Sequence, residues 1–227
     1  MDDFKPTART RIKRLAKRAH YDRETVYRIL DQGVVAHIGY VIEGQPYVTP
    51  TNYWREGERL VWHGSSASKM LRSMKQPAPV CVTVSLFDGL VLARSGFHSS
   101  VNYRAVMCFG EASEVTDPAA KLAALEAFVE RVTPGRWDEL RPVTKQELKA
   151  TCVITMTIDD AACKVRTGGP IDDEDDYALD VWAGVVPLSM VAGKAEPDAR
   201  LKPGVPLPSY LRQVDLESYA RRTRAAE

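Results

Sequence analysis

The sequence predicts a mainly β (α+β) fold, in which a small antiparallel barrel of about six or seven strands carries a few peripheral helices. Short runs that alternate apolar and polar residues follow one another between Gly and Pro turn signals. The chain lacks strand–helix–strand alternation and a GxGxxG motif after a strand, so a Rossmann sheet is not expected. With 227 residues and 44% hydrophobic content, the chain can bury one sizeable core.

Composition and charge argue against several classes of protein. A net charge of +1 gives no sign of a nucleic-acid partner. Four widely spaced cysteines lack the spacing of a zinc site and are expected to be reduced. The chain contains neither a signal peptide nor an apolar run of roughly 18 residues, so we expect a soluble, cytoplasmic protein with no membrane partner. Basic residues gather in residues 1–20, which we expect to form an arm that docks on another surface.

The first half of the chain predicts one helix and an antiparallel meander. Asp22 is a typical N-cap, and Gly33 is expected to end the helix that follows it. Residues 34–64 then read as three strands, with turns at Glu43–Gly44 and Glu56–Gly57. Pro46 and Pro50 place the middle strand near a sheet edge or a bulge.

The second half predicts longer strands and two helices. Residues 80–95 form a continuous β run with a turn or bulge at 87–89, and residues 102–115 form the next strand with a bend at Gly110. Asp117 and Pro118 start a helix that Pro134–Gly135 closes, and residues 144–149 form a shorter helix.

The remainder of the chain is expected to hold two further strands and a tail. One long strand covers 151–168, and a last strand covers 181–191. An acidic loop at 168–177 separates them, and the Pro-rich tail has one short helix around 210–214. The expected domains are the basic arm 1–20, the barrel 21–190 and a C-terminal extension 191–227.

The stretch Arg59–Met74 carries the chemistry that suggests a ligand. It reads as a strand, a Gly turn and an amphipathic helix that opens at Ser65 or Ser66. Ser65, Ser68 and Lys69 share the polar face beside the helix N-terminus, where a phosphate monoester would find cations and N–H donors. A capped helix with a solvated basic face is the alternative.

The ordered set PYVTPTNY, WHGSSASKM, VCVTVSLFDGLVLARS and NYRAVMCFGEA resembles the FMN-binding split-barrel family. This family includes the pyridoxamine 5′-phosphate oxidases and the nitroimidazole-resistance proteins, and the chain is most similar to its flavin-nucleotide-binding branch. The resemblance covers roughly residues 20–190 and implies a six- or seven-stranded antiparallel split β-barrel. It also implies a homodimer with FMN at the interface.

The resemblance assigns cofactor-binding roles to residues in three strands and one helix. It implies that FMN phosphate lies at the helix after the third strand, the ribityl chain and ring edge along the second strand, and part of the site on a later strand. The residues so assigned are Ser65, Ser68, Lys69 and His63, then Thr49, Pro50, Thr51, Asn52 and Tyr53, and finally Asn102, Tyr103 and Arg104.

Each assignment has an ordinary structural alternative. His63 also reads as a core histidine, and Arg104 as one half of a surface ion pair. Residues 50–53 also read as a Pro-induced edge with solvent-facing polar groups, although Tyr53 is placed to stack on a flavin ring.

The expected function is that of an FMN-dependent oxidoreductase, which uses NAD(P)H to reduce a small electron-poor substrate. FMN would perform the chemistry, so no side chain is assigned a catalytic role. No metal site is expected, because the acidic residues 172–176 lack EF-hand spacing. The tail LKPGVPLPSYLRQVDLE does not match the basic C-terminal segment of the true oxidases, which argues against pyridoxamine oxidation.

The second reading is a non-catalytic module that carries flavin or haem on the same barrel. FAD, a deazaflavin and haem are the alternative cofactors. The absorbance of the purified protein and mass spectrometry of the released ligand separate these readings.

Overall fold

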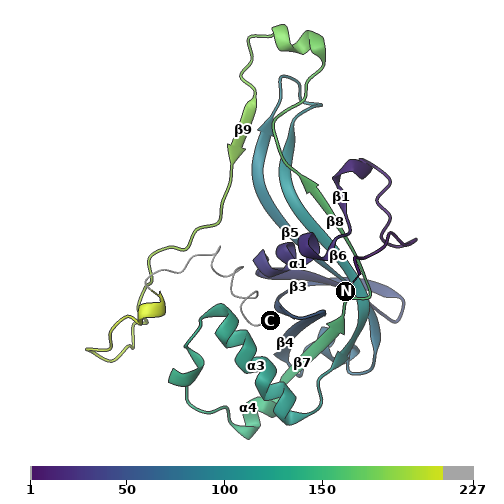
Figure 1. Cartoon of the computed structure of the whole chain (residues 1–227). Coiled ribbons are helices and arrows are strands. Elements are labelled where there is room, and N and C mark those ends of the chain that lie inside the picture. Colours follow the sequence, from purple (N-terminus) through teal and green to yellow (C-terminus); the bar gives the residue numbers. More distant parts are fainter. Residues whose placement is uncertain (1, 212–227) are drawn as a thin grey trace.

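The computed structural model describes residues 2–211, and its centre is a closed antiparallel barrel (Figure 1). Six strands form the ring in the order β6-β7-β4-β3-β2-β5, and a β6–β5 pairing closes it. The described residues hold nine strands: β1 (Ala19–His20), β2 (Val35–Ile42), β3 (Gln45–Glu56), β4 (Arg59–Ser65), β5 (Ala78–Leu92), β6 (Ser100–Glu114), β7 (Thr151–Thr157), β8 (Asp160–Arg166) and β9 (Gly184–Pro187). The predicted mainly β barrel is confirmed.

The meander β2–β3–β4 forms as predicted because its turns have the required residues. Glu43 and Gly44 both have positive φ values, 51° and 79°, as a two-residue hairpin turn needs. Gly57, with φ 56°, serves the second turn.

Strands β5 and β6 continue beyond the barrel as a long hairpin, with β8 and β9 along its two sides (Figure 1). The ladder pairs Phe87 with Tyr103 and Gly89 with Asn102, so Asp88 is the extra residue of a bulge. This bulge confirms the irregularity predicted at 87–89.

The predicted single strand 151–168 is wrong. The chain forms β7 and β8 with a corner at 158–159, because strand β6 pairs with β8 up to Phe109 and with β7 from Ala112. Gly110 lies where β6 changes partner, and a Cβ there would be 2.1 Å from the carbonyl oxygen of Thr157. Only glycine permits this close approach.

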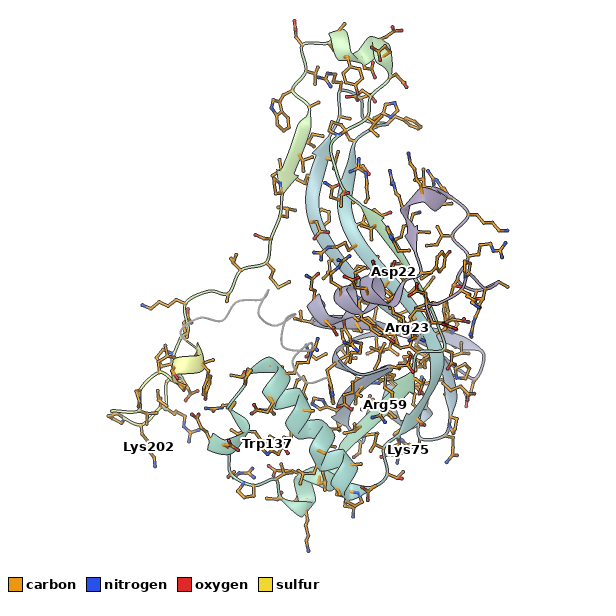
Figure 2. The ribbon with its side chains drawn as sticks, in the orientation of Figure 1. Asp22, Arg23, Arg59, Lys75, Trp137 and Lys202 are labelled. Carbon is orange, nitrogen blue, oxygen red and sulfur yellow. The ribbon has the colours of Figure 1, made fainter. Side chains whose placement is uncertain are left out.

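Helix α1 (Arg23–Gln32) packs against the barrel through residues with no exposed surface. Asp22 (labelled in Figure 2) precedes the helix. It accepts a hydrogen bond from the Thr25 amide at 2.8 Å, which confirms the predicted cap. Val26, Ile29 and Leu30 join the main core with Trp62 of β4.

Helices α3 (Pro118–Val132) and α4 (Lys145–Ala150) lie on the outside of the barrel (Figure 1). Asp117 caps α3 as predicted, and Thr144, predicted as the first residue of the shorter helix, caps α4. A second apolar cluster lies beneath α3, where Phe128 packs on Trp54, Val61 and Val153. Strands β3, β4 and β7 therefore have apolar residues on both faces.

Three other predicted elements differ in extent. Helix α2 (Lys69–Ser73) opens at Lys69, because β4 continues through Ser65. The last strand, predicted over 181–191, is reduced to β9. The helix predicted around 210–214 lies only partly in the described residues. A single helical turn covers Ser209–Leu211, and residues 212–214 lie outside the described part of the chain.

The basic N-terminal segment lies against its own barrel. Phe4 and Thr10 are buried, β1 pairs with β8, and Arg9 forms an ion pair with Asp160. At the other end, the segment that contains Lys202 runs away from the barrel (Figure 2). None of the helices within residues 2–211 is long and apolar enough to cross a membrane.

Candidate functional site

Strand β3 connects two groups of predicted site residues, and Lys69 lies at one end. Its ammonium donates a hydrogen bond to the Tyr47 hydroxyl at 2.8 Å and sits 4.4 Å from the centre of that ring. Tyr47 stacks on Tyr40, whose hydroxyl is 3.0 Å from the Thr49 hydroxyl. The contact with Tyr47 raises the pKa of Lys69, so this exposed group is a cation at neutral pH.

The other end of β3 meets the junction between α1 and β2. The Asn52 amide donates to the carbonyl of Val34 at 3.0 Å. Arg104 donates two hydrogen bonds to the Asp88 carboxylate, at 2.9 and 2.7 Å, and a third to the Gln32 side chain. Arg104 therefore forms an ion pair, as expected from the alternative to its cofactor-binding role. Its bond to Gln32 also connects the hairpin to α1.

Tyr53 belongs to the core, and its predicted stacking on a flavin is wrong. Its side chain has no exposed surface, and its hydroxyl donates to the carbonyl of Leu30. The pleat of β3 turns Tyr53 inward and Pro50 and Asn52 outward. Thr51 is half-buried, and its hydroxyl donates a hydrogen bond to the carbonyl of Asn52 at 3.3 Å.

The outward side chains of β2 and β3 form an exposed, mostly apolar surface, which we call the outer sheet face. Val48 is 68% exposed and Val41 62%, and Val35 is also exposed. His37 lies among them, opposite Pro50 of β3 and Thr83 of β5. His37 was not among the predicted site residues, although the outward valines Val35, Val41 and Val48 are a signal that this face is not purely solvent-facing.

The predicted phosphate cradle is less closely assembled than its spacing suggested. Ser65 is exposed and accepts a hydrogen bond from the Ala67 amide at 3.2 Å, while Ser68 precedes α2 without a side-chain cap. Lys69 turns toward Tyr47 and not toward either serine. The assignment of these three residues to a phosphate stays a prediction.

His63 lies beneath α3, on the outside of the barrel. Its ring is 4.6 Å from Phe128 and 5.8 Å from Trp54, and its buried Nδ1 has no hydrogen-bond partner within residues 2–211. Burial lowers the pKa of His63, so the imidazole is neutral at pH 7.

Asn102 lies farther out on the hairpin. It is buried, donates to the Gly168 carbonyl at 3.1 Å and accepts from Arg166. Its neighbour Tyr103 pairs with Arg166 across the ladder. Asn102 therefore has partners in β8 and just after it, and within residues 2–211 no hydrogen bond joins it to Lys69.

The hairpin tip holds one cluster with the composition of a metal site. The side chains of His98, Asp173 and Asp176 place three ligand atoms within 4.8 Å of one another. Asp173 is largely exposed and already pairs with His98 at 3.2 Å. The expectation of no metal site stays a prediction.

The comparisons with known proteins agree with this architecture. The family described as pyridoxamine 5′-phosphate oxidase matches residues 22–165. The chain belongs to the pyridoxamine 5′-phosphate oxidase family. The predicted family is therefore confirmed. Among curated proteins, none matches the chain.

Two solved structures resemble the chain over most of its length. The flavocytochrome Anf3 from Azotobacter vinelandii is 47% identical, covering 91% of this chain and 96% of that one, with a TM-score of 0.86. The FAD and heme binding protein from Mycobacterium smegmatis is 37% identical, covering 86% and 96%, with a TM-score of 0.82. A putative 5-nitroimidazole antibiotic resistance protein from Bacteroides thetaiotaomicron shares the fold, with 23% identity over 65% and 86% and a TM-score of 0.54.

Proposed function

We propose that this protein binds a flavin and a haem and transfers electrons from a reduced nicotinamide nucleotide to an acceptor. The observation that carries the proposal is the 47% identity, over 91% of the chain, to a protein named as a flavocytochrome. The name of the second relative favours FAD over the FMN that the sequence resemblance implied. A flavin accepts hydride from such donors and releases electrons singly to haem iron.

The residues along β3 fit an elongated anionic cofactor. The exposed Lys69 supplies a cation at one end, and Arg104, which is ion-paired with Asp88, lies at the other. The distance along β3 from Tyr47 to Asn52 is about 17 Å, at roughly 3.4 Å per residue. A flavin on this strand would contact Pro50 and His37 on the outer sheet face, and its negative charge would meet the Lys69 ammonium.

We propose that a second copy of the chain covers the outer sheet face and encloses the flavin. The exposed valines of this face favour a protein partner over water. Val48→Lys would then give a monomer with less flavin, measured by light scattering and by the ratio of flavin to protein. Val132→Lys is a control on another exposed valine. A Val48→Lys dimer that keeps its flavin would contradict this arrangement.

Two histidines fit a haem ligand, because haem iron binds an imidazole nitrogen that no other group holds. His98 pairs with Asp173, and His20 lies 3.9 Å from Asp22, whereas His37 and His63 form no ion pair with a carboxylate within residues 2–211. Burial keeps His63 neutral. Its orphaned Nδ1 and its aromatic neighbours make it the better fit of the two.

The absorbance of the purified full-length protein tests the proposal. We expect flavin bands together with a Soret band, and FAD as the flavin released on denaturation. Reduction of the flavin by NADH or NADPH without oxygen would support the oxidoreductase function. A flavin that is not reduced would instead support a non-catalytic carrier of flavin and haem. Release of FMN would support the cofactor that the sequence resemblance implies. A protein that stays colourless after incubation with FAD and haem would overturn the proposal.

A further inference from the structure

A cavity of about 400 Å³ lies between α4 and the start of α3. Both helices lie on the side of the barrel away from the hairpin tip (Figure 1). The cavity is within the size range of small-molecule sites. We call it the lysine pocket, and its lining residues are Thr116, Pro118, Lys121, Lys145, Leu148 and Lys149.

Positive charge gathers in the lysine pocket without compensation. None of its three ammonium groups forms an ion pair or hydrogen bond with any residue in 2–211, and no acidic side chain lines the cavity. Asp117, which lies between the lining residues Thr116 and Pro118, already accepts a hydrogen bond from the Ala120 amide at 2.8 Å. Glu147 of α4 is likewise engaged, by Arg141 and by Thr144.

The positions of these lysines are unfavourable for the helices that carry them. Lys145 and Lys149 are one turn apart on α4, so their charges repel. Lys121 stands in the first turn of α3, and Lys145 opens α4, where the helix dipole disfavours cations. An anion in the cavity would relieve all of these interactions at once.

The pocket adjoins the turn to which the sequence assigned a phosphate. The Ser66 amide donates to the carbonyl of Ala150 at 2.8 Å, and Ala150 directly follows Lys149. The pKa of the Cys152 thiol is raised to about 11, chiefly by burial and also by Glu114. The positive charge of Lys121 acts in the opposite direction and lowers that pKa. Lys121 therefore lies close to strand β7 as well as to the cavity.

We propose that the lysine pocket binds the phosphate groups of a small phosphorylated ligand, with Leu148 and Pro118 against its apolar part. Three ammonium groups suit a diphosphate, whose oxygens accept charge-assisted hydrogen bonds. The phosphate comes either from the ADP half of FAD, a reading that rests on the proposed function, or from a free phosphorylated metabolite.

Calorimetry with the full-length protein as purified tests this proposal, with ADP and inorganic phosphate as probes. The variant Lys145→Gln/Lys149→Gln removes two cations from exposed positions. Lys13→Gln/Lys17→Gln, on the remote N-terminal segment, makes the same change in net charge. Flavin content is measured in parallel as the ratio of flavin to protein after gel filtration.

The outcomes separate the two sources. If the ligand is a free metabolite, ADP binds the wild type and the control, and it binds the pocket variant at least about tenfold more weakly. The flavin content is then equal in all three proteins. For FAD, ADP does not bind the loaded wild type, and only the pocket variant loses flavin. If all three proteins match in flavin content and in binding of both probes, the proposal is wrong. If the purified protein contains no flavin, the flavin proposal fails. The ADP titration of that same protein still tests the lysine pocket, so the two failures are distinguishable.

Discussion

Arg104 holds Asp88, the extra residue of the β5 bulge, with two hydrogen bonds of 2.9 and 2.7 Å. The bulge re-aims the Asp88 carboxylate toward β6, and Arg104 also donates to Gln32 at the end of α1. The pair thus fixes the long hairpin against the helix that packs on the barrel.

We expect Asp88→Ala to lower the free energy of unfolding by about 1 kcal/mol, since the pair is bidentate but partly exposed. Urea denaturation of the full chain measures the change. Asp159→Ala removes an exposed carboxylate with no ion pair among residues 2–211 and should have little effect. Equal midpoints for both variants would show that the Arg104–Asp88 pair contributes nothing.

Lys69→Ala should weaken flavin binding by one or more tenfold steps, since a charge-assisted contact contributes about 1.5–3 kcal/mol. Tyr47→Phe keeps the cation and removes only its hydrogen-bond partner, so a smaller loss is expected. Fluorescence titration of flavin measures both affinities. Unchanged affinity in Lys69→Ala would remove Lys69 from the site.

His63 should make stability depend on pH. Burial lowers its pKa in the folded protein from the ordinary value of 6.5, so below that value the unfolded chain binds more protons. The free energy of unfolding should therefore fall as pH drops from about 6.5 toward the folded-state pKa. We expect His63→Asn to reduce this slope in denaturation curves measured between these limits. An identical slope in the variant would assign the dependence to other groups.

If haem iron is held as proposed, His63→Ala should abolish or shift the Soret band while the flavin bands remain. His37→Ala, on the outer sheet face, tests the second candidate. Absorbance of the two purified variants at equal protein concentration gives the comparison. A Soret band unchanged in both would exclude both histidines as ligands.

The sequence by itself determined the elements whose signals are local. Asp22 and the Asp117–Pro118 pair start helices as predicted, and the turns at Gly44 and Gly57 set the meander. The same ordered motifs were enough to identify the family.

Only the tertiary structure decided which face each residue occupies and which distant residues meet. Tyr53 and Pro50 lie on one strand with apolar residues on both faces, so alternation could not tell core from surface. The corner between β7 and β8 depends on the close approach of Gly110 to Thr157, a contact between separate strands. Lys121 and Lys149 share a cavity only because α3 and α4 pack together. Two lysines so far apart in the sequence form no local motif that could have predicted this pocket.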